Sequence, residues 1–221
     1  MVNINNEKLD EEMKRYWDIF LKSNEPRFKE PHITVLHFKI NDVAVANKHF
    51  EAIKRVATDK FNKHVENIEI HIKNKAKLLG RPTGNKFLTL DCDVDEDTAK
   101  LIENFRRETL EGLKDVFDAK SMSIDKLDEG WYSVSYDGKA LITLPSYSWE
   151  ISKWTPHVSI LSLFDIRSAN RELFDKFEIK DNTPNIKHIM DVLEKYYYEH
   201  TKIEPKSIDV EGSNVKFICL S

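Results

Sequence analysis

The sequence Pro31-His32-Ile33-Thr34-Val35-Leu36 returns in the second half of the chain as Pro156-His157-Val158-Ser159-Ile160-Leu161. Each copy reads proline, histidine, β-branched residue, hydroxyl residue, β-branched residue, leucine. Both copies have the composition of a strand, in which side chains two positions apart share a face. The histidine and the hydroxyl of each copy therefore point to one side, and the β-branched residues point to the other side, toward a core.

A repeated polar pair inside an apolar strand is hard to explain by packing. A buried imidazole and a buried hydroxyl each need hydrogen-bond partners. If the two halves fold alike and face each other, His32 and His157 converge with Thr34 and Ser159 on one cleft. Such a site holds an acid, a base and two hydroxyl donors to an anion. We therefore expect these four residues to be catalytic.

The paired His-x-Thr and His-x-Ser motifs resemble those of the 2H phosphoesterase superfamily. That superfamily includes LigT-like RNA 2′,3′-cyclic phosphodiesterases, enzymes that degrade 2′,5′-oligoadenylate, and phage proteins that destroy cyclic oligonucleotide immune signals. The resemblance spans roughly residues 30–220, but its specific part is the two tetrapeptides. It implies an α+β bilobal fold in which two pseudo-symmetric antiparallel sheet lobes, with outer helices, surround a central cleft. Many members have threonine where this chain has Ser159, and both residues supply a hydroxyl.

The resemblance also implies a function. It implies a metal-independent phosphodiesterase without a cofactor, whose substrate is a small nucleotide such as 2′,5′-oligoadenylate or a cyclic oligonucleotide messenger. Such enzymes often counter host immune signalling. Two alternatives stay open, an RNA 2′,3′-cyclic phosphodiesterase that acts on RNA ends and a nucleotide-binding module without turnover. A third is a structural protein in which the two imidazoles lie far apart.

Composition narrows the classes of partner. The chain has 221 residues, of which 40% are hydrophobic and 33% charged, with a formal net charge of −4. We expect a single bilobal domain over residues 1–221. Without a basic block, long nucleic acid is not an expected partner. No apolar run approaches the roughly 20 residues that cross a bilayer, so no membrane partner is expected either.

The cysteines and the N-terminus indicate the compartment. Cys92 and Cys219 fall in strand-like segments, where buried reduced thiols are a simpler interpretation than a disulfide. Residues 1–10 lack the basic and apolar regions of a signal peptide. These features together predict a cytoplasmic protein.

Hydrophobic periodicity predicts alternating helices and strands. Helices are expected over residues 7–22, from a cap at Asn41 or Asp42 past Val56, over 95–117, from a cap at Ser168 to about 177, and over 185–200. Strands are expected over residues 32–40, 65–72, 87–92 and 157–163, followed by a closing hairpin over 208–220 that turns near Gly212.

An aromatic-rich segment, residues 119–153, fits neither half and links the two lobes. It is either a hairpin that packs on the core or a lid on which nucleobases stack, at about 1–3 kcal/mol per base. Trp154 is the first candidate for contact with the substrate because it lies three residues before His157. Tyr147 and Trp149 are the other two candidates.

Other polar motifs carry less information. His37 is predicted to be structural, since it lies five positions from His32 and a regular strand turns it to the opposite face. The run Asp91-x-Asp93-x-Asp95 lacks the glycine and glutamate of a calcium loop, and a strand that enters an acidic helix N-terminus explains it better. The turn at residues 80–85 is either a phosphate-binding loop or only a turn. No histidine or cysteine spacing predicts a metal site.

Overall fold

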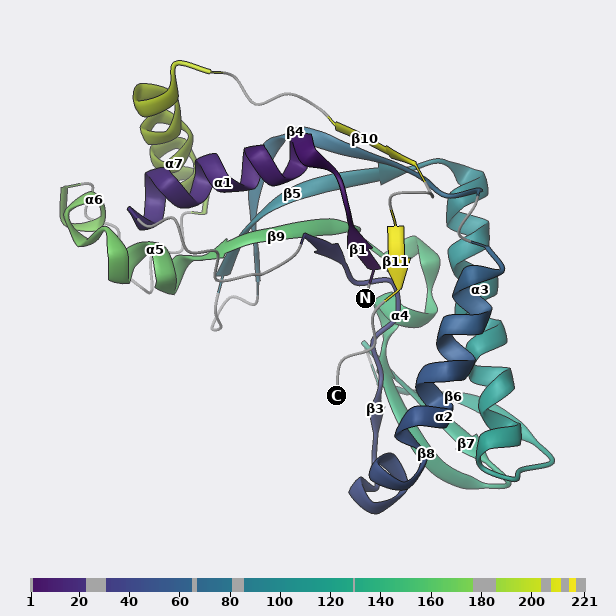
Figure 1. Ribbon diagram of the computed structural model, residues 1–221. Helices are drawn as coiled ribbons and strands as arrows, with labels where there is room; N and C mark the ends of the chain where they lie inside the picture. The colour runs from purple at the N-terminus through teal and green to yellow at the C-terminus, as the bar shows by residue number, and fades with distance from the viewer. Residues whose placement is uncertain are drawn as a thin grey trace.

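A computed structural model gives the structure of residues 2–22, 31–64, 67–80, 86–128, 130–176, 186–203, 208–211 and 215–217. The fold is α+β and has two antiparallel sheets (Figure 1). The large sheet contains, in spatial order, β10 (Ile208–Glu211), β4 (Glu69–Gly80), β5 (Lys86–Val94), β9 (His157–Ser162), β2 (His32–Ile33), β1 (Val2–Ile4) and β11 (Val215–Phe217). The small sheet contains β3 (Lys39–Ile40), β8 (Lys139–Pro145), β7 (Trp131–Tyr136) and β6 (Met122–Asp128).

The helices divide between the two sheets. The elements are α1 (Glu7–Leu21), α2 (Val43–Asn62), α3 (Glu96–Val116), α4 (Ser146–Trp149), the 3₁₀ turn η2 (Ile151–Lys153), α5 (Leu163–Ala169), α6 (Arg171–Lys176) and α7 (Ile186–Thr201). Figure 1 shows α1, α5, α6 and α7 gathered toward one end of the large sheet, whereas α2 and α3 run beside the small sheet. None of the helices within the described ranges combines the length and hydropathy needed to cross a membrane.

Side-chain caps begin the helices α1, α2 and α3. Asn6 caps α1, Asp42 caps α2, and Asp95 caps α3 by accepting a hydrogen bond from the Thr98 backbone N–H at 2.6 Å. Asp42 was one of the two caps predicted for α2, and the acidic start of α3 was also predicted. The helices predicted over residues 7–22, 95–117 and 185–200 are confirmed within a residue or two at each end.

The cap predicted at Ser168 is wrong. Ser162, at the end of β9, accepts a hydrogen bond from the Asp165 backbone N–H at 3.0 Å and so begins α5. Ser168 lies inside α5, where its hydroxyl donates to the Phe164 carbonyl oxygen at 2.8 Å. A serine hydroxyl can cap a helix or bond back within it, and here the strand end decides which serine caps.

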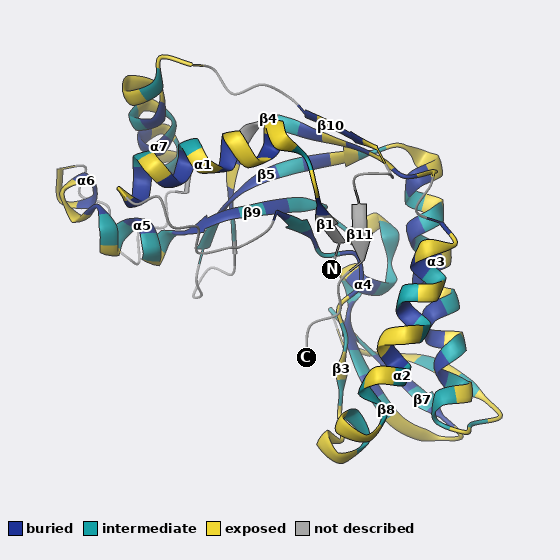
Figure 2. Cartoon of the chain, in the orientation of Figure 1, coloured by how far each residue is buried: buried dark blue, intermediate teal, exposed yellow. Residues whose placement is uncertain are grey.

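Two hydrophobic cores hold the fold. The larger core lies between the large sheet and a layer formed by α1, α7 and the first half of α3, which contributes Ile102 and Phe105. The smaller core lies between the small sheet and α2 with the second half of α3, which contributes Leu110 and Leu113. The buried residues of α2 and α3 face the interior, and the exposed residues face outward (Figure 2). Helix α3 therefore packs against both sheets.

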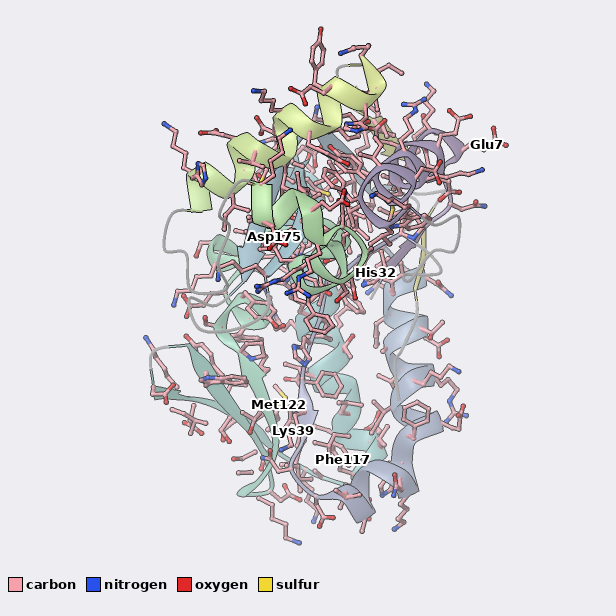
Figure 3. All side chains as sticks on the ribbon, turned by 90° about the vertical axis from the view of Figure 1, so that its left-hand side faces the viewer. Glu7, His32, Lys39, Phe117, Met122 and Asp175 are labelled. Carbon is pink, nitrogen blue, oxygen red and sulfur yellow. The ribbon has the colours of Figure 1, made fainter. Side chains whose placement is uncertain are left out.

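Two chain segments cross from one sheet to the other, side by side and antiparallel. One runs from β2 to β3 and the other from β8 to β9, because Ile33 pairs with Val158 and Lys39 pairs with Thr143. In Figure 3, His32 lies at the level of the large sheet and Lys39 lies below it. The strand predicted over residues 32–40 is thus two short strands. Residues 34–38 leave the ladder because the neighbouring segment forms α4 and η2 at that level.

Three further predictions need correction. Residues 208–217 do not form a hairpin, since β10 pairs with β4 and β11 pairs with β1 at opposite edges of the large sheet. Residues 119–153 are more than an insertion between lobes, because they supply β6, β7 and β8 of the small sheet. The strand predicted from residue 65 begins later and extends further, over Glu69–Gly80. The turn at residues 81–85 and Cys219 lie outside the described residues, whereas Cys92 is a buried free thiol.

Candidate active site

The two His motifs meet on neighbouring strands of the large sheet. Strand β2 pairs with β9 in antiparallel orientation, with Ile33 opposite Val158. If this register continues by one residue in each direction, His32 lies opposite Ser159 and Thr34 lies opposite His157. Residues directly opposite each other share a face and have Cβ atoms about 4.5–5.5 Å apart. In that register the four side chains would occupy the corners of a rectangle, with the imidazoles on one diagonal and the hydroxyls on the other.

The two faces of these strands differ in burial, as the sequence predicts. The four motif side chains are all partly exposed. The apolar residues that alternate with them are at most 2% exposed and belong to the larger core: Ile33, Val35, Val158 and Ile160. This alternation places the imidazoles and hydroxyls on the face of the sheet that the core does not use.

The arrangement of the motifs differs from the expectation in one respect. The sequence predicted two similar halves that face each other across a cleft, each with one motif. Both motif strands instead belong to the same sheet, and the two sheets have seven and four strands. Backbone pairing between β2 and β9 brings the motifs together, so their proximity does not depend on the closure of two lobes.

A backbone hydrogen bond orients the imidazole of His157. Its Nδ1 lies 2.9 Å from the carbonyl oxygen of Thr155. A carbonyl oxygen can only accept, so Nδ1 must carry the proton whenever this bond forms. The neutral ring then presents Nε2 as an acceptor, and the protonated ring presents Nε2–H as a donor. This is the geometry that a general acid or base requires.

The polar face continues onto β5 and β4. Asp91 lies opposite His157, Thr89 lies opposite Ser159, and Lys77 of β4 lies opposite Thr89. Asp91 and Lys77 form an ion pair. Beside the motif residues, β5 therefore contributes a carboxylate and β4 contributes an ammonium group.

Neither Asp91 nor Lys77 was predicted from the sequence to belong to the site. One signal could have identified Asp91. Polar Thr89, Asp91 and Asp93 alternate with apolar residues along β5, as the motif residues do along their own strands. Lys77 carried no comparable signal, because its register depends on the irregularity in β4 between Ile72 and Ala76.

Two tryptophans bind the backbone of the motif strands. The register of β9 shifts after Ser159, so that Ile160 has no partner on β5, and the Trp17 indole N–H donates to the Ile160 carbonyl oxygen at 3.2 Å. On the other motif strand, the Trp154 indole N–H donates to the Thr34 carbonyl oxygen at 2.9 Å. Each indole thus satisfies a carbonyl where the strand departs from regular pairing.

Arg106 of α3 lies beside the first motif. Its Nε–H donates to the Val35 carbonyl oxygen at 2.7 Å, and its guanidinium lies 4.9 Å from the centre of the Trp154 ring. The residue is 1% exposed, and neither Nη nitrogen has a hydrogen-bond partner among the residues that the structure describes. Burial lowers the pKa of Arg106 to about 10, and the nearby Glu103 carboxylate opposes this shift. Arg106 therefore remains a cation at neutral pH.

The three aromatic candidates occupy different environments. Trp154 is half-buried between Arg106 and the Thr34 backbone. Trp149 packs against the smaller core, with its ring 6.5 Å from that of Tyr132. Tyr147 is exposed, and its hydroxyl lies 2.8 Å from Nδ1 of His37. Tyr147 is thus the member of this set with the most surface open to a ligand.

His37 occupies a different position from the one expected. Because residues 34–38 are not a strand, the facing argument used for His37 does not apply. Its side chain is exposed beside Tyr147, and its backbone N–H donates to the Ser148 hydroxyl oxygen at 3.0 Å. Among the described residues, no group of three or more His, Cys, Asp or Glu side chains is placed to hold a metal ion.

Comparisons with known proteins found no relative of this chain. No protein-family model, no curated protein and no solved structure matches the chain.

Proposed function

We propose that this chain is a metal-independent phosphodiesterase of the 2H type that cleaves a small nucleotide by acid–base catalysis with two histidines. The substrate classes are 2′,5′-oligoadenylate and cyclic oligonucleotide messengers, and the proposed role is to counter host immune signalling. The observation that carries the proposal is the pairing of β2 with β9, which brings together the two motifs, whose imidazoles and hydroxyls are partly exposed.

The chemistry follows from the diagonal arrangement. Imidazole has an ordinary pKa near neutrality, so one ring can be neutral while the other is protonated. The neutral ring accepts a proton from the attacking hydroxyl. The other ring donates a proton to the leaving oxygen as the phosphorus–oxygen bond to that oxygen breaks. A phosphate above the rectangle has the two imidazoles on opposite sides, as a displacement with entry and departure on opposite sides requires.

The hydroxyls and the neighbouring ion pair complete the proposal. Thr34 and Ser159, on the other diagonal, would donate hydrogen bonds to the non-bridging oxygens, where negative charge increases in the transition state. A ribose hydroxyl that attacks the adjacent phosphate yields a cyclic phosphate, and water that attacks a cyclic phosphate yields a monoester. Lys77, paired with Asp91 beside His157, would add positive charge for a substrate with more than one phosphate.

The test is turnover in excess EDTA. The panel contains 2′,5′-oligoadenylate, 2′,3′-linked and 3′,3′-linked cyclic dinucleotides, and a nucleoside 2′,3′-cyclic phosphate. We expect cleavage of one class, with kcat at least 100-fold lower in His32→Ala and in His157→Ala. Exposed His200→Ala, on α7, is the matched control and should retain full activity. No cleavage by folded wild-type protein would refute a phosphodiesterase, and loss of cleavage in EDTA would refute the metal-free mechanism.

The same panel separates the alternatives. Cleavage of only the nucleoside 2′,3′-cyclic phosphate would indicate an enzyme that acts on RNA ends. Binding of a nucleotide without any product would indicate a binding module that lacks turnover.

A further inference from the structure

Two stacked side chains hold consecutive carbonyl groups of the first motif strand. The Trp154 indole N–H binds the Thr34 carbonyl oxygen, and the Arg106 Nε–H binds the Val35 carbonyl oxygen. The guanidinium lies over the indole at 4.9 Å, so each group restricts the position of the other. One comes from α3, and the other from the segment that leads directly into His157.

This part of the strand lacks the support that a sheet normally gives. The regular part of β2 ends at Ile33, one residue before Thr34, and the neighbouring segment from β8 to β9 forms α4 and η2 instead of continuing as a strand. Thr34 is therefore the one member of the rectangle outside a regular strand. The hydroxyl of Thr34 must still be placed accurately, since an error of about 1 Å can cost 100-fold in rate.

Simple packing does not account for Arg106. An apolar side chain of similar volume would fill the same space without a buried charge. The guanidinium instead makes one hydrogen bond and one ring contact, while both Nη nitrogens lack a partner among the described residues. An apolar residue could not make both contacts, the hydrogen bond to the Val35 carbonyl oxygen and the stacking on the Trp154 ring.

We propose that Trp154 and Arg106 are positioning residues that fix the Thr34 hydroxyl relative to His157. This inference rests on the proposed phosphodiesterase function for its kinetic consequence. Trp154 then acts through the backbone of Thr34 and not as a platform for a nucleobase. Arg106 acts through Trp154 and through the Val35 carbonyl. Neither residue needs to touch the substrate.

A double-mutant cycle tests this role. Trp154→Phe keeps an aromatic ring beside the guanidinium, and it removes the N–H donor together with the second ring of the indole. We expect it to lower kcat about tenfold and to leave KM within about twofold, because the loss is in alignment and not in binding. In a Thr34→Ala background the same substitution should have no further effect on kcat, since the group that it positions is gone. An equal loss in both backgrounds would overturn the proposal.

Two more variants provide a control for Trp→Phe replacement and a test of the stacking between Arg106 and Trp154. Trp131→Phe changes a partly exposed indole at the start of β7 and should leave kcat unchanged. Arg106→Lys keeps the positive charge and loses the planar stack. We expect it to lower kcat as Trp154→Phe does, and full activity would overturn the role given to the stack.

A readout without substrate separates this proposal from the proposed function. Amide hydrogen exchange over residues 31–38 should be faster in Trp154→Phe and in Arg106→Lys, while exchange over residues 131–136 of the small sheet should be unchanged. Unchanged exchange over residues 31–38 would overturn the positioning role even in an active enzyme. If the wild type cleaves no nucleotide, faster exchange there would still support the positioning role while the phosphodiesterase proposal fails.

Discussion

Replacement of Arg106 by methionine should separate stability from activity. Methionine has a similar volume and an apolar, flexible side chain, so it fills the site without a charge. Arg106 is 1% exposed, which makes a substitution here look severe. We nevertheless expect the free energy of unfolding to change by less than about 2 kcal/mol at pH 7, while kcat falls at least tenfold.

The magnitude follows from opposing contributions. Loss of the charged hydrogen bond to the Val35 carbonyl costs about 1.5–3 kcal/mol, and loss of the contact with the Trp154 ring costs about 1–2 kcal/mol. Against this, burial lowers the pKa of Arg106 from its ordinary value to about 10. That shift corresponds to a penalty of roughly 3 kcal/mol on the charged form, which methionine removes. The contributions nearly cancel.

The pH dependence of this effect has a definite sign. The folded-state pKa of Arg106 is depressed, so the unfolded state binds more protons only above about pH 10. The burial penalty is therefore fully present at lower pH and is relieved as the pH rises through 10. Between pH 6 and 8, the difference in stability between Arg106→Met and the wild type should be constant.

Chemical denaturation is the assay, with two controls on the same helix. Arg107→Met changes the exposed neighbour and should alter the free energy of unfolding by less than about 0.5 kcal/mol. Phe105→Ala empties a fully buried site and should cost about 3–5 kcal/mol. A loss of more than about 3 kcal/mol in Arg106→Met would refute the reasoning, because it would mean that the guanidinium is strongly net stabilising.

Two further substitutions test the packing and charge of the α2–α3 pair. A Cβ at Gly112 would lie 2.9 Å from Cγ1 of Val56, so Gly112→Ala should destabilise the fold by about 1 kcal/mol despite its better helix propensity. In a Val56→Ala background, denaturation should show that the same change stabilises by about 1 kcal/mol, and equal effects in both backgrounds would contradict the contact. Glu108 accepts hydrogen bonds from the Lys63 ammonium, and these bonds lower the pKa of the Glu108 carboxyl. The ionised carboxylate therefore stabilises the folded state at neutral pH. This contribution to the free energy of unfolding is lost as the pH falls through the folded-state pKa. Glu108→Gln should cost about 0.5 kcal/mol at pH 7 and less as the pH falls through the folded-state pKa, and a cost that does not change with pH would show that the charge is irrelevant.

Local patterns predicted the elements whose signals are contained within a few residues. The helix starts at Asp42, predicted with Asn41 as the alternative, and at about residue 95 are confirmed, because a cap depends only on the following turn. The alternation in both His motifs correctly separated the core face from the exposed face. Ser168 was read wrongly because Ser162 offers the same capping group and the end of β9 chooses between them.

Local patterns did not predict which distant segments of the chain pair as strands. Residues 208–217 have the pattern of a hairpin, but the two strands occupy opposite edges of the large sheet. Residues 32–40 have the pattern of one strand, but the partner segment forms α4 and η2 and divides it. Which strands pair depends on the whole sheet, and no short stretch of sequence carries that information.

For the candidate site, the sequence by itself determined that His32 shares a face with Thr34 and that His157 shares a face with Ser159, because the two-residue period of a strand is a local property. Only the tertiary structure decided that His32 and His157 are neighbours on one sheet, since the pairing of β2 with β9 joins segments far apart in the chain. It also decided that Arg106 and Trp154 bind the backbone next to Thr34. A side chain that acts through another residue's backbone leaves no periodic signal, because its position is set by the packing of a helix from elsewhere in the chain.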